Sequence, residues 1–270
     1  MRDYGRVTSP RSDPNSELNQ DTEDHSVVSG AADTQAERDA ERRERARLYP
    51  RVTSFRSRRG ALNQAQQDNW ERLWPVIGRD VSETEKVDTA AWFGRDAPLI
   101  LEIGCGTGTS TAAMAATEPD IDVIAVDVYR PGIAQLLGAI SRGGLENIRV
   151  IRGDAVIVLK DMLAPASLTG VRVFFPDPWP KARHHKRRLL QPGTLEQIAG
   201  VLRDGGVLHI ATDHADYAES IAAVIDSQSL LVPTDQPIPF SVDRPVTKFE
   251  GRAAREGRPV TEFVLTRVPR

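Results

Sequence analysis

The order of apolar and polar positions divides the chain into two unequal parts. Residues 1–46 contain almost no large apolar side chains, whereas from Pro98 onward short β-branched runs alternate with segments of helical period. This alternation predicts right-handed βαβ crossovers on a mostly parallel sheet, which is an α/β fold. Strands are expected over 99–103, 121–127, 148–152, 171–175, 206–211, 239–242 and 262–267, and helices over 61–78, 109–117, 131–141, 155–163, 190–202 and 216–227.

The first part is charged as well as polar. Residues 1–46 hold seven Arg, no Lys and eleven Asp or Glu, a net charge of −4, which leaves +1 for residues 47–270 out of the chain total of −3. Such a composition buries too little apolar surface to offset the entropy of ordering. We therefore expect a disordered tail over 1–46, either simply solvated or touching RNA or regulatory, followed by one domain over 47–270.

Composition narrows the class of protein. With 270 residues and 40% hydrophobic content, the chain can build one sizeable core. The one cysteine, Cys105, excludes an intrachain disulfide and favours a reducing, cytoplasmic location. No apolar run approaches the roughly 18 residues of a membrane span, so no membrane association is expected.

Two basic strips give the chain local positive charge although its total charge is negative. Residues 47–60 hold five Arg and no acid, interleaved with Tyr49 and Phe55, and residues 181–188 hold five Lys or Arg, two His and no acid. Arginine pairs with phosphate and stacks on bases, so both strips are candidate RNA contacts, with an ordinary basic surface as the alternative. His184 and His185 lack a His or Cys partner at ligand spacing, so no metal is expected.

The second strip directly follows a predicted buried strand. Residues 171–175 are apolar with β-branched and aromatic members, and three alternating prolines over 176–180 then end the strand, because proline lacks the N–H that a ladder needs. Asp177 lies between the first two prolines. The pattern indicates a rigidly held carboxylate beside a site for a polyanion.

A glycine-rich turn follows the first predicted strand. Glu102 precedes Gly104, Gly106 and Gly108. The dinucleotide fingerprint requires a glycine where Thr109 stands, so a nicotinamide site is not favoured. Glycines let the backbone approach a ligand closely, and the carboxylate can attract a cationic group. A generic strand-to-helix turn is the alternative.

Two further acids end the next two strands. Asp127 can accept hydrogen bonds from ribose hydroxyls, and Asp154 can either accept from an adenine amino group or cap the following helix. Ligands of such sheets bind outside the carboxyl ends of the strands. With Glu102, these acids therefore define one candidate cofactor site.

The glycine turn with its preceding acid resembles the first motif of S-adenosylmethionine-dependent methyltransferases. Other blocks are more specific: residues 51–55, 174–188, 211–213 and 244–250 resemble the bacterial tRNA (guanine-N7)-methyltransferase family, over roughly residues 47–268. The resemblance implies a Rossmann-like class I methyltransferase fold with a mostly parallel seven-stranded sheet and helices on both faces. It also implies methyl transfer from S-adenosyl-L-methionine to N7 of the variable-loop guanine (position 46) of tRNA.

The same resemblance assigns roles residue by residue. Asp127 stands where the family often has Glu, and Pro180 and His214 stand where His and Trp are common, which leaves the site plausible. The implied site comprises Glu102, Gly104, Gly106, Gly108, Asp127, Asp154 and Asp177 for the cofactor, Asp177 for catalysis, Lys181, Asp213, Thr247, Lys248, Phe249 and Glu250 for the substrate, and Arg183, His184, His185, Lys186, Arg187 and Arg188 for RNA.

The implied chemistry defines a hypothesis for Asp177. Guanine N7 has a free lone pair, so its methylation needs no general base. We hypothesise that Asp177 orients guanine and stabilises the positive charge that develops on its ring. The competing interpretations are a methyltransferase of this fold for another RNA or a small molecule, and a non-catalytic RNA-binding relative. The oligomeric state is left open.

Overall fold

The computed structural model describes residues 6–8, 54–55, 60–234, 236–245, 257 and 259–270. Within them one sheet has the strand order β1-β9-β7-β6-β3-β4-β5-β2, and β8 also pairs with β9. The strands are β1 (Arg6–Thr8), β2 (Gly78–Asp80), β3 (Leu99–Ile103), β4 (Asp122–Asp127), β5 (Ile148–Arg152), β6 (Leu168–Phe174), β7 (Leu202–Thr212), β8 (Leu231–Pro233) and β9 (Val260–Arg267).

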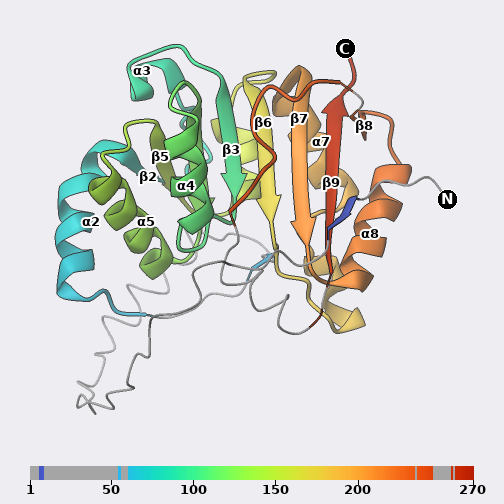
Figure 1. Cartoon of the computed structure of the whole chain (residues 1–270), viewed down its shortest axis with the longest axis horizontal. Coiled ribbons are helices and arrows are strands. Elements are labelled where there is room, and N and C mark those ends of the chain that lie inside the picture. Colours follow the sequence, from blue (N-terminus) through green and yellow to red (C-terminus); the bar gives the residue numbers. More distant parts are fainter. Residues whose placement is uncertain (1–5, 9–53, 56–59, 235, 246–256, 258) are drawn as a thin grey trace.

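The central sheet is parallel and reverses its winding direction next to β3. Strands β2, β5, β4, β3, β6 and β7 pair in parallel, while β9 runs antiparallel to β7 and pairs with β1 and β8 along its outer edge. The chain adds β4 and β5 on one side of β3, and β6 and β7 on the other (Figure 1). A ligand crevice is therefore expected outside the carboxyl ends of β3 and β6.

Helices cover both faces of this sheet. Alternate residues of β4 illustrate the two faces, because Val123 belongs to the same buried cluster as Trp70 and Ile133, whereas Ile124 belongs to the cluster that contains Ile198 and Ile221. The first face is covered by α2 (Gln64–Ile77), α4 (Thr109–Thr117) and α5 (Arg130–Gly143), and the second by α6 (Ala155–Ile157), the π-helix η1 (Val158–Met162), α7 (Pro192–Val201) and α8 (Ala215–Asp226). The short helix α3 (Thr89–Phe93) precedes β3.

A loop segment, residues 238–245, continues the cover of the first face over β6 and β7. We call this segment the strap. Its Phe240 is buried with Ile100 and Val207. In Figure 1 the strap is the red-brown coil that crosses in front of β6. The strap thus takes the place of a helix on this part of the sheet.

The predicted α/β fold is confirmed. Strands β3 and β5 and helix α4 have the predicted bounds, and the other predicted helices agree within a few residues. The predicted strand over 239–242 is wrong, because those residues belong to the strap. There the backbone N–H of Ser241 donates to Glu118 (2.6 Å) rather than to a sheet ladder.

Several elements were not predicted. The short strands β1, β2 and β8 and helix α3 are additional, and with the strand over 239–242 absent the sheet has nine strands where seven were expected. Helix α2 continues two residues past Pro75, which was expected to kink or end it. Among the described residues, no helix combines the length and apolarity needed to cross a membrane.

Part of the predicted tail is a strand. Residues 6–8 form β1 and pair with residues 260–262 of β9. The prediction of disorder is therefore wrong for these three residues. The other residues of 1–46 lie outside the described part of the chain, and so does most of the basic strip over 47–60.

Candidate functional site

A cavity of about 190 Å³ lies outside the carboxyl ends of β3, β4 and β6. This is the position that the reversal of strand order predicts. The cavity brings together three motifs that are separate in the sequence. Its lining includes Gly104, Gly106, Asp127, Tyr129, Phe175 and Asp177.

The glycine turn after β3 uses backbone conformations that favour glycine. Gly104, Gly106 and Gly108 have φ values of 80°, 57° and 72°. A side chain at Gly104 or Gly106 would meet no atom within 4 Å, whereas one at Gly108 would lie 2.5 Å from Leu136. Gly108 therefore serves the packing of α4 on α5, and the first two glycines leave open backbone beside the cavity.

Asp127 is tied to this turn. Its Oδ2 accepts a hydrogen bond from the Gly106 N–H (2.7 Å), and its Oδ1 accepts one from the Tyr129 N–H (2.8 Å). Burial raises the pKa of Asp127, and the hydrogen bonds from Tyr129 and Gly106 oppose that shift. The carboxylate thus fixes the turn and lines the cavity at the same time.

Glu102 is buried on β3, at 3% exposure. Burial raises its pKa to about 6, and the positive charge of Arg172 partly opposes this. Its Oε2 has no hydrogen-bond partner among the described residues. A buried carboxylate next to an open glycine turn suits a ligand with cationic and N–H groups, and a cofactor contact by Glu102 stays a prediction.

Asp154 follows β5 and is 2% exposed. Its carboxylate accepts a hydrogen bond from the Val156 N–H (3.0 Å) and caps α6. The capping alternative is therefore confirmed. Gly153 and Ala155, on either side of it, line the cavity, so a cofactor contact by Asp154 stays a prediction.

Asp177 lies on a strained loop that extends β6 into the cavity. Phe175 and Trp179 have φ values of 50° and 45°, which bulky residues rarely adopt. The Phe175 N–H donates to the Ala211 carbonyl (2.8 Å), and the buried Trp179 donates from Nε1 to the Ser54 carbonyl (2.7 Å). The loop is thus held from β7 and from the N-terminal segment, with Asp177 between the two attachments.

The basic run forms the 3₁₀-helix η2 (Ala182–Arg187) after this loop. Lys181, Arg183 and Lys186 are exposed, and His184, His185 and Arg187 are half-buried. The Arg187 guanidinium lies 4.4 Å from the centre of the Trp179 ring. The run therefore presents its charge within a few residues of Asp177.

Arg188 differs from the rest of the run. It is 3% exposed, donates from Nε to the Pro178 carbonyl (2.9 Å) and forms an ion pair with Asp216. Its guanidinium also lies 4.8 Å from the centre of the Tyr217 ring. The expectation of an exposed RNA contact is thus wrong for Arg188, because its side chain holds the strained loop onto α8.

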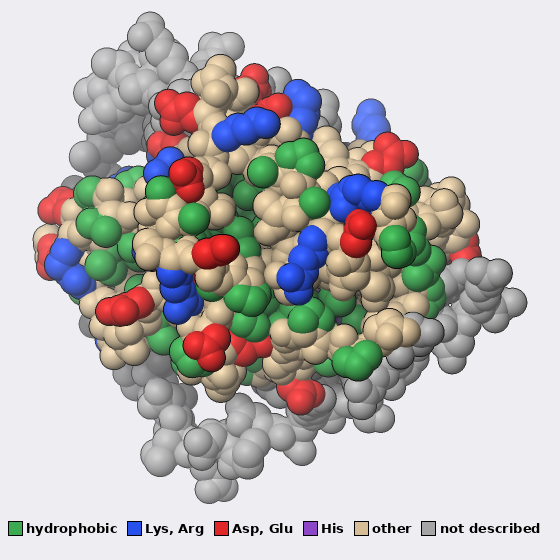
Figure 2. All heavy atoms as spheres, turned by 90° about the horizontal axis from the view of Figure 1, so that it is seen from above, with side chains coloured by type: hydrophobic (Ala, Val, Ile, Leu, Met, Phe, Trp, Pro, Cys, Tyr) green, Lys and Arg blue, Asp and Glu red, His purple; other side chains and the backbone are tan. Residues whose placement is uncertain are grey.

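The surface at the amino ends of the parallel strands, opposite the cavity, has a different charge pattern. Figure 2 views the molecule from above, at the amino ends of the parallel strands, and shows Lys and Arg side chains interspersed with Asp and Glu. A surface with mixed charges gives no preference for a polyanion. The basic run at the carboxyl ends is therefore a local feature of the site.

The remaining predicted residues divide into two groups. Asp213 is half-buried and follows β7, the neighbour of the Asp177 strand. Thr247, Lys248, Phe249 and Glu250 lie outside the described residues. Cys105 is buried and burial raises the pKa of its thiol well above the usual range. Within the described part of the chain, no three His, Cys, Asp or Glu side chains are placed to hold a metal ion.

Some lining residues were missed by the sequence analysis. Ser54 and Phe55 were noted within a basic strip and a family-like block but given no place in the site, and Tyr129 and Leu189 were not noted at all. The signal available for Tyr129 was its place two residues after Asp127. Ser54 is 125 residues from Trp179, so local sequence gives no sign of that hydrogen bond.

Comparison with known proteins adds independent observations. A family model described as "Putative methyltransferase" matches residues 96–263. A curated protein of Nocardia farcinica is 60% identical over 233 residues, covering 82% of this chain and 86% of its own length. Proteins of Rhodococcus jostii (58% identical, covering 82% and 86%) and Mycobacterium leprae (59% identical, covering 79% and 95%) are similarly close. All three are named tRNA (guanine-N(7)-)-methyltransferase.

Proposed function

This chain belongs to the tRNA (guanine-N(7)-)-methyltransferase family, and on that premise we propose that it transfers a methyl group from S-adenosyl-L-methionine to N7 of a guanine in tRNA. The finer proposal is that the target is guanine 46 of the variable loop. The observation that carries the proposal is the shared cavity, which the glycine turn, Asp127 and Asp177 line together. In this proposal the donor site and the substrate carboxylate lie side by side in that cavity.

The residues around the glycine turn suit the cofactor. S-adenosyl-L-methionine supplies an activated methyl group on a sulfonium sulfur and has no pyrophosphate. Glu102 would attract its cationic groups, and Asp127 would accept from its ribose hydroxyls with the lone pairs that Gly106 and Tyr129 leave free. Gly104, Gly106, Gly108 and Asp154 complete the proposed cofactor set.

Asp177 is the proposed catalytic residue. Because N7 keeps a free lone pair, the reaction needs orientation and charge stabilisation instead of proton removal. A carboxylate held on the strained loop can accept hydrogen bonds from guanine N1–H and its 2-amino group, which adenine does not offer in the same arrangement. The fixed negative charge would also stabilise the positive charge that the ring acquires.

The basic run is the proposed grip on the tRNA backbone. Arg183, His184, His185, Lys186 and Arg187 are at least partly exposed and can contact phosphate, whereas Arg188 holds the run in place from inside. Lys181 would reach guanine O6 or a flanking phosphate. Asp213, Thr247, Lys248, Phe249 and Glu250 remain proposed substrate contacts.

The deciding experiment is nucleoside analysis of tRNA incubated with the protein and labelled S-adenosyl-L-methionine. We expect the label in 7-methylguanosine, and its loss when guanine 46 of a transcript is replaced by adenine. Label in another nucleoside or in a small molecule would favour the alternative of a different substrate. Cofactor binding without label in any nucleic acid would favour a non-catalytic relative.

A further inference from the structure

The strap follows one face of β6 from its middle to its catalytic end. Residues 170, 172 and 174 of β6 share a face because side chains alternate along a strand. The strap contacts all three positions, with Phe240 on Gly170, Ser241 on Arg172 and Arg244 over Phe174. It therefore leads directly to the loop that holds Asp177.

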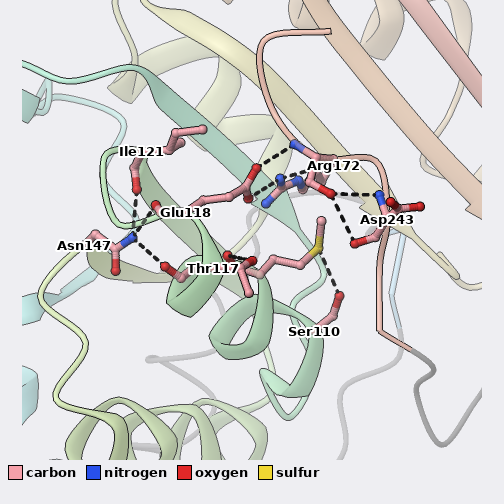
Figure 3. Close-up of polar contacts among 10 residues, drawn as sticks. Ser110, Thr117, Glu118, Ile121, Asn147, Arg172 and Asp243 are labelled. Atoms are coloured by element: carbon pink, nitrogen blue, oxygen red, sulfur yellow. Dashed lines mark hydrogen bonds and ion pairs between the residues drawn. The ribbon is translucent and has the colours of Figure 1, made fainter.

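The middle contact fixes the strap to the sheet. Arg172 is fully buried, and its Nη2 donates to Glu118 Oε2 (2.8 Å) and to the Ser241 carbonyl (3.2 Å). Glu118 Oε1 accepts from the Ser241 N–H (2.6 Å), and the Ser241 hydroxyl accepts from the Asp243 N–H (3.0 Å). Figure 3 shows Glu118 at the end of α4 facing Arg172, and Asp243 on the side of Arg172 that faces away from Glu118.

The last contact is a polar group that we call the clamp, made of the buried Arg244 and His209 and the half-buried Glu262. Arg244 is 6% exposed and donates from Nη2 to Glu262 Oε1 (2.7 Å). Glu262 Oε2 lies 3.2 Å from Nε2 of the fully buried His209. Burial alone would raise the pKa of Glu262. The hydrogen bonds and charges of His209 and Arg244 outweigh this and lower that pKa to about 2, so the Glu262 carboxylate is charged.

The clamp packs directly against the two aromatic residues that precede Asp177. The Arg244 guanidinium lies 5.1 Å from the centre of the Phe175 ring and 5.9 Å from that of Phe174. The His209 ring meets the Phe174 ring edge-on, with 5.0 Å between centres. Each of these contacts restricts the side chains at the point where the chain leaves β6.

Phe175 needs such restraint. A left-handed conformation of a bulky residue costs on the order of 1–3 kcal/mol and persists only when the surroundings enforce it. One backbone hydrogen bond to Ala211 and the stacked guanidinium enforce it here. Two residues later the chain places Asp177 in the cavity, so the orientation of Phe175 determines where that carboxylate points.

We propose that Arg244, Glu262 and His209 act as positioning residues that hold the Phe174–Phe175 turn and thereby orient Asp177 toward the bound guanine. The inference rests on the proposed function of Asp177. The clamp itself touches neither substrate nor cofactor in this scheme. Its effect on the reaction should therefore pass entirely through Asp177.

A double-mutant cycle on kcat tests this. Arg244→Met keeps the side-chain length and removes the charge, and we expect it to lower kcat about 10- to 100-fold with less than about 3-fold change in the cofactor Kd. In an Asp177→Asn background the same change should lower kcat less than about 2-fold. Losses that multiply in the double variant would overturn the inference, because a general structural defect acts independently of Asp177.

Two further variants keep the test decisive. Glu262→Gln preserves the shape of the clamp and should show the same non-additivity if Arg244→Met does not fold. Arg267→Met is the matched control, since Arg267 is also buried (7% exposed) but lies at the opposite end of β9 and donates to the Ala199 carbonyl. An equal kcat loss in Arg267→Met would overturn a specific role for the clamp.

The outcomes separate this inference from the proposed function. Absence of 7-methylguanosine with the unmodified protein would refute the proposed function itself. Full activity of Asp177→Asn would overturn the role of Asp177 and the clamp inference with it, while methylation would still stand. If Asp177→Asn lowers activity and the losses of Asp177→Asn and Arg244→Met multiply in the double variant, only the positioning role of the clamp would be refuted.

Discussion

Gly106 lies in the turn after β3, Asp127 ends the adjacent parallel strand β4, and the two are joined by a hydrogen bond of 2.7 Å from the glycine N–H to the carboxylate. The bond makes the glycine turn and the acid of β4 a single unit. One side chain therefore has two tasks, because it shapes the turn and offers acceptors to the cavity. Changing it should affect binding through both.

Asp127→Asn should weaken cofactor binding by about 10-fold or more. An amide has one acceptor oxygen, so one of the N–H groups of Gly106 and Tyr129 loses its partner, which costs roughly 1–3 kcal/mol. Titration calorimetry with S-adenosyl-L-methionine measures this. Asp122→Asn at the other end of β4 is the control, and an equal loss there would contradict a local cause.

Sequence patterns predicted the central fold well, because the elements there follow simple periodicities. The buried run of β3, the helix after the glycine turn and β5 were predicted at their observed bounds. The strap was missed for a physical reason. Ile238, Phe240 and Val242 stand at alternate positions as strand residues would, yet Ser241 hydrogen-bonds to Glu118, 123 residues away, instead of to another strand.

The site was predictable where a functional side chain lies in a local sequence motif directly after a strand. Asp127 and Asp177 were identified from their positions after strands, and both line the cavity. Arg188 was misjudged, since a run of basic residues does not reveal which member turns inward toward Asp216. The clamp was missed because it joins residues of the strap, β7 and β9 that lie far apart in the sequence.

Two glycines of the turn should respond differently to alanine. Gly108→Ala should lower the free energy of unfolding by more than about 2 kcal/mol, because two costs add. The alanine would be strained in the left-handed backbone conformation, and its Cβ would collide with Leu136. Gly104→Ala meets open space and should cost only about 1–2 kcal/mol while weakening cofactor binding. Urea unfolding and calorimetry measure both effects, and the reverse ranking of stabilities would refute the division of roles.

Arg187 and Arg188 form a matched pair within the basic run. Arg187→Ala should weaken tRNA binding and reduce the slope of log K against log salt by up to about 0.9, with little change in stability. Arg188→Ala should instead destabilise the fold, because Pro178 and Asp216 lose a buried partner. Binding isotherms at several salt concentrations, with thermal unfolding beside them, distinguish the two. An unchanged salt slope in Arg187→Ala would remove that residue from the RNA contact.

Cofactor affinity should fall as the pH drops through about 6. Burial raises the pKa of Glu102 from 4.5 to about 6, so its carboxylate is charged above that pH and neutral below it. Only the charged form attracts the cationic groups of S-adenosyl-L-methionine. Calorimetric Kd values between pH 5 and pH 8 should show the loss, on the order of 10-fold.

Glu102→Gln is the control for that dependence, and it also tests the stability that burial of the acid implies. A raised pKa means that the folded protein holds the Glu102 proton more tightly than the unfolded chain does. The protonated side chain therefore contributes stability that is fully present below pH 4.5 and is lost as the pH rises through 6. The shift corresponds to about 2 kcal/mol. Relative to the unmodified protein, Glu102→Gln should therefore gain about that much stability between pH 4.5 and pH 6.5, and its cofactor Kd should not vary across this range. A Kd in Glu102→Gln that still rises toward pH 5 would assign the dependence to another group.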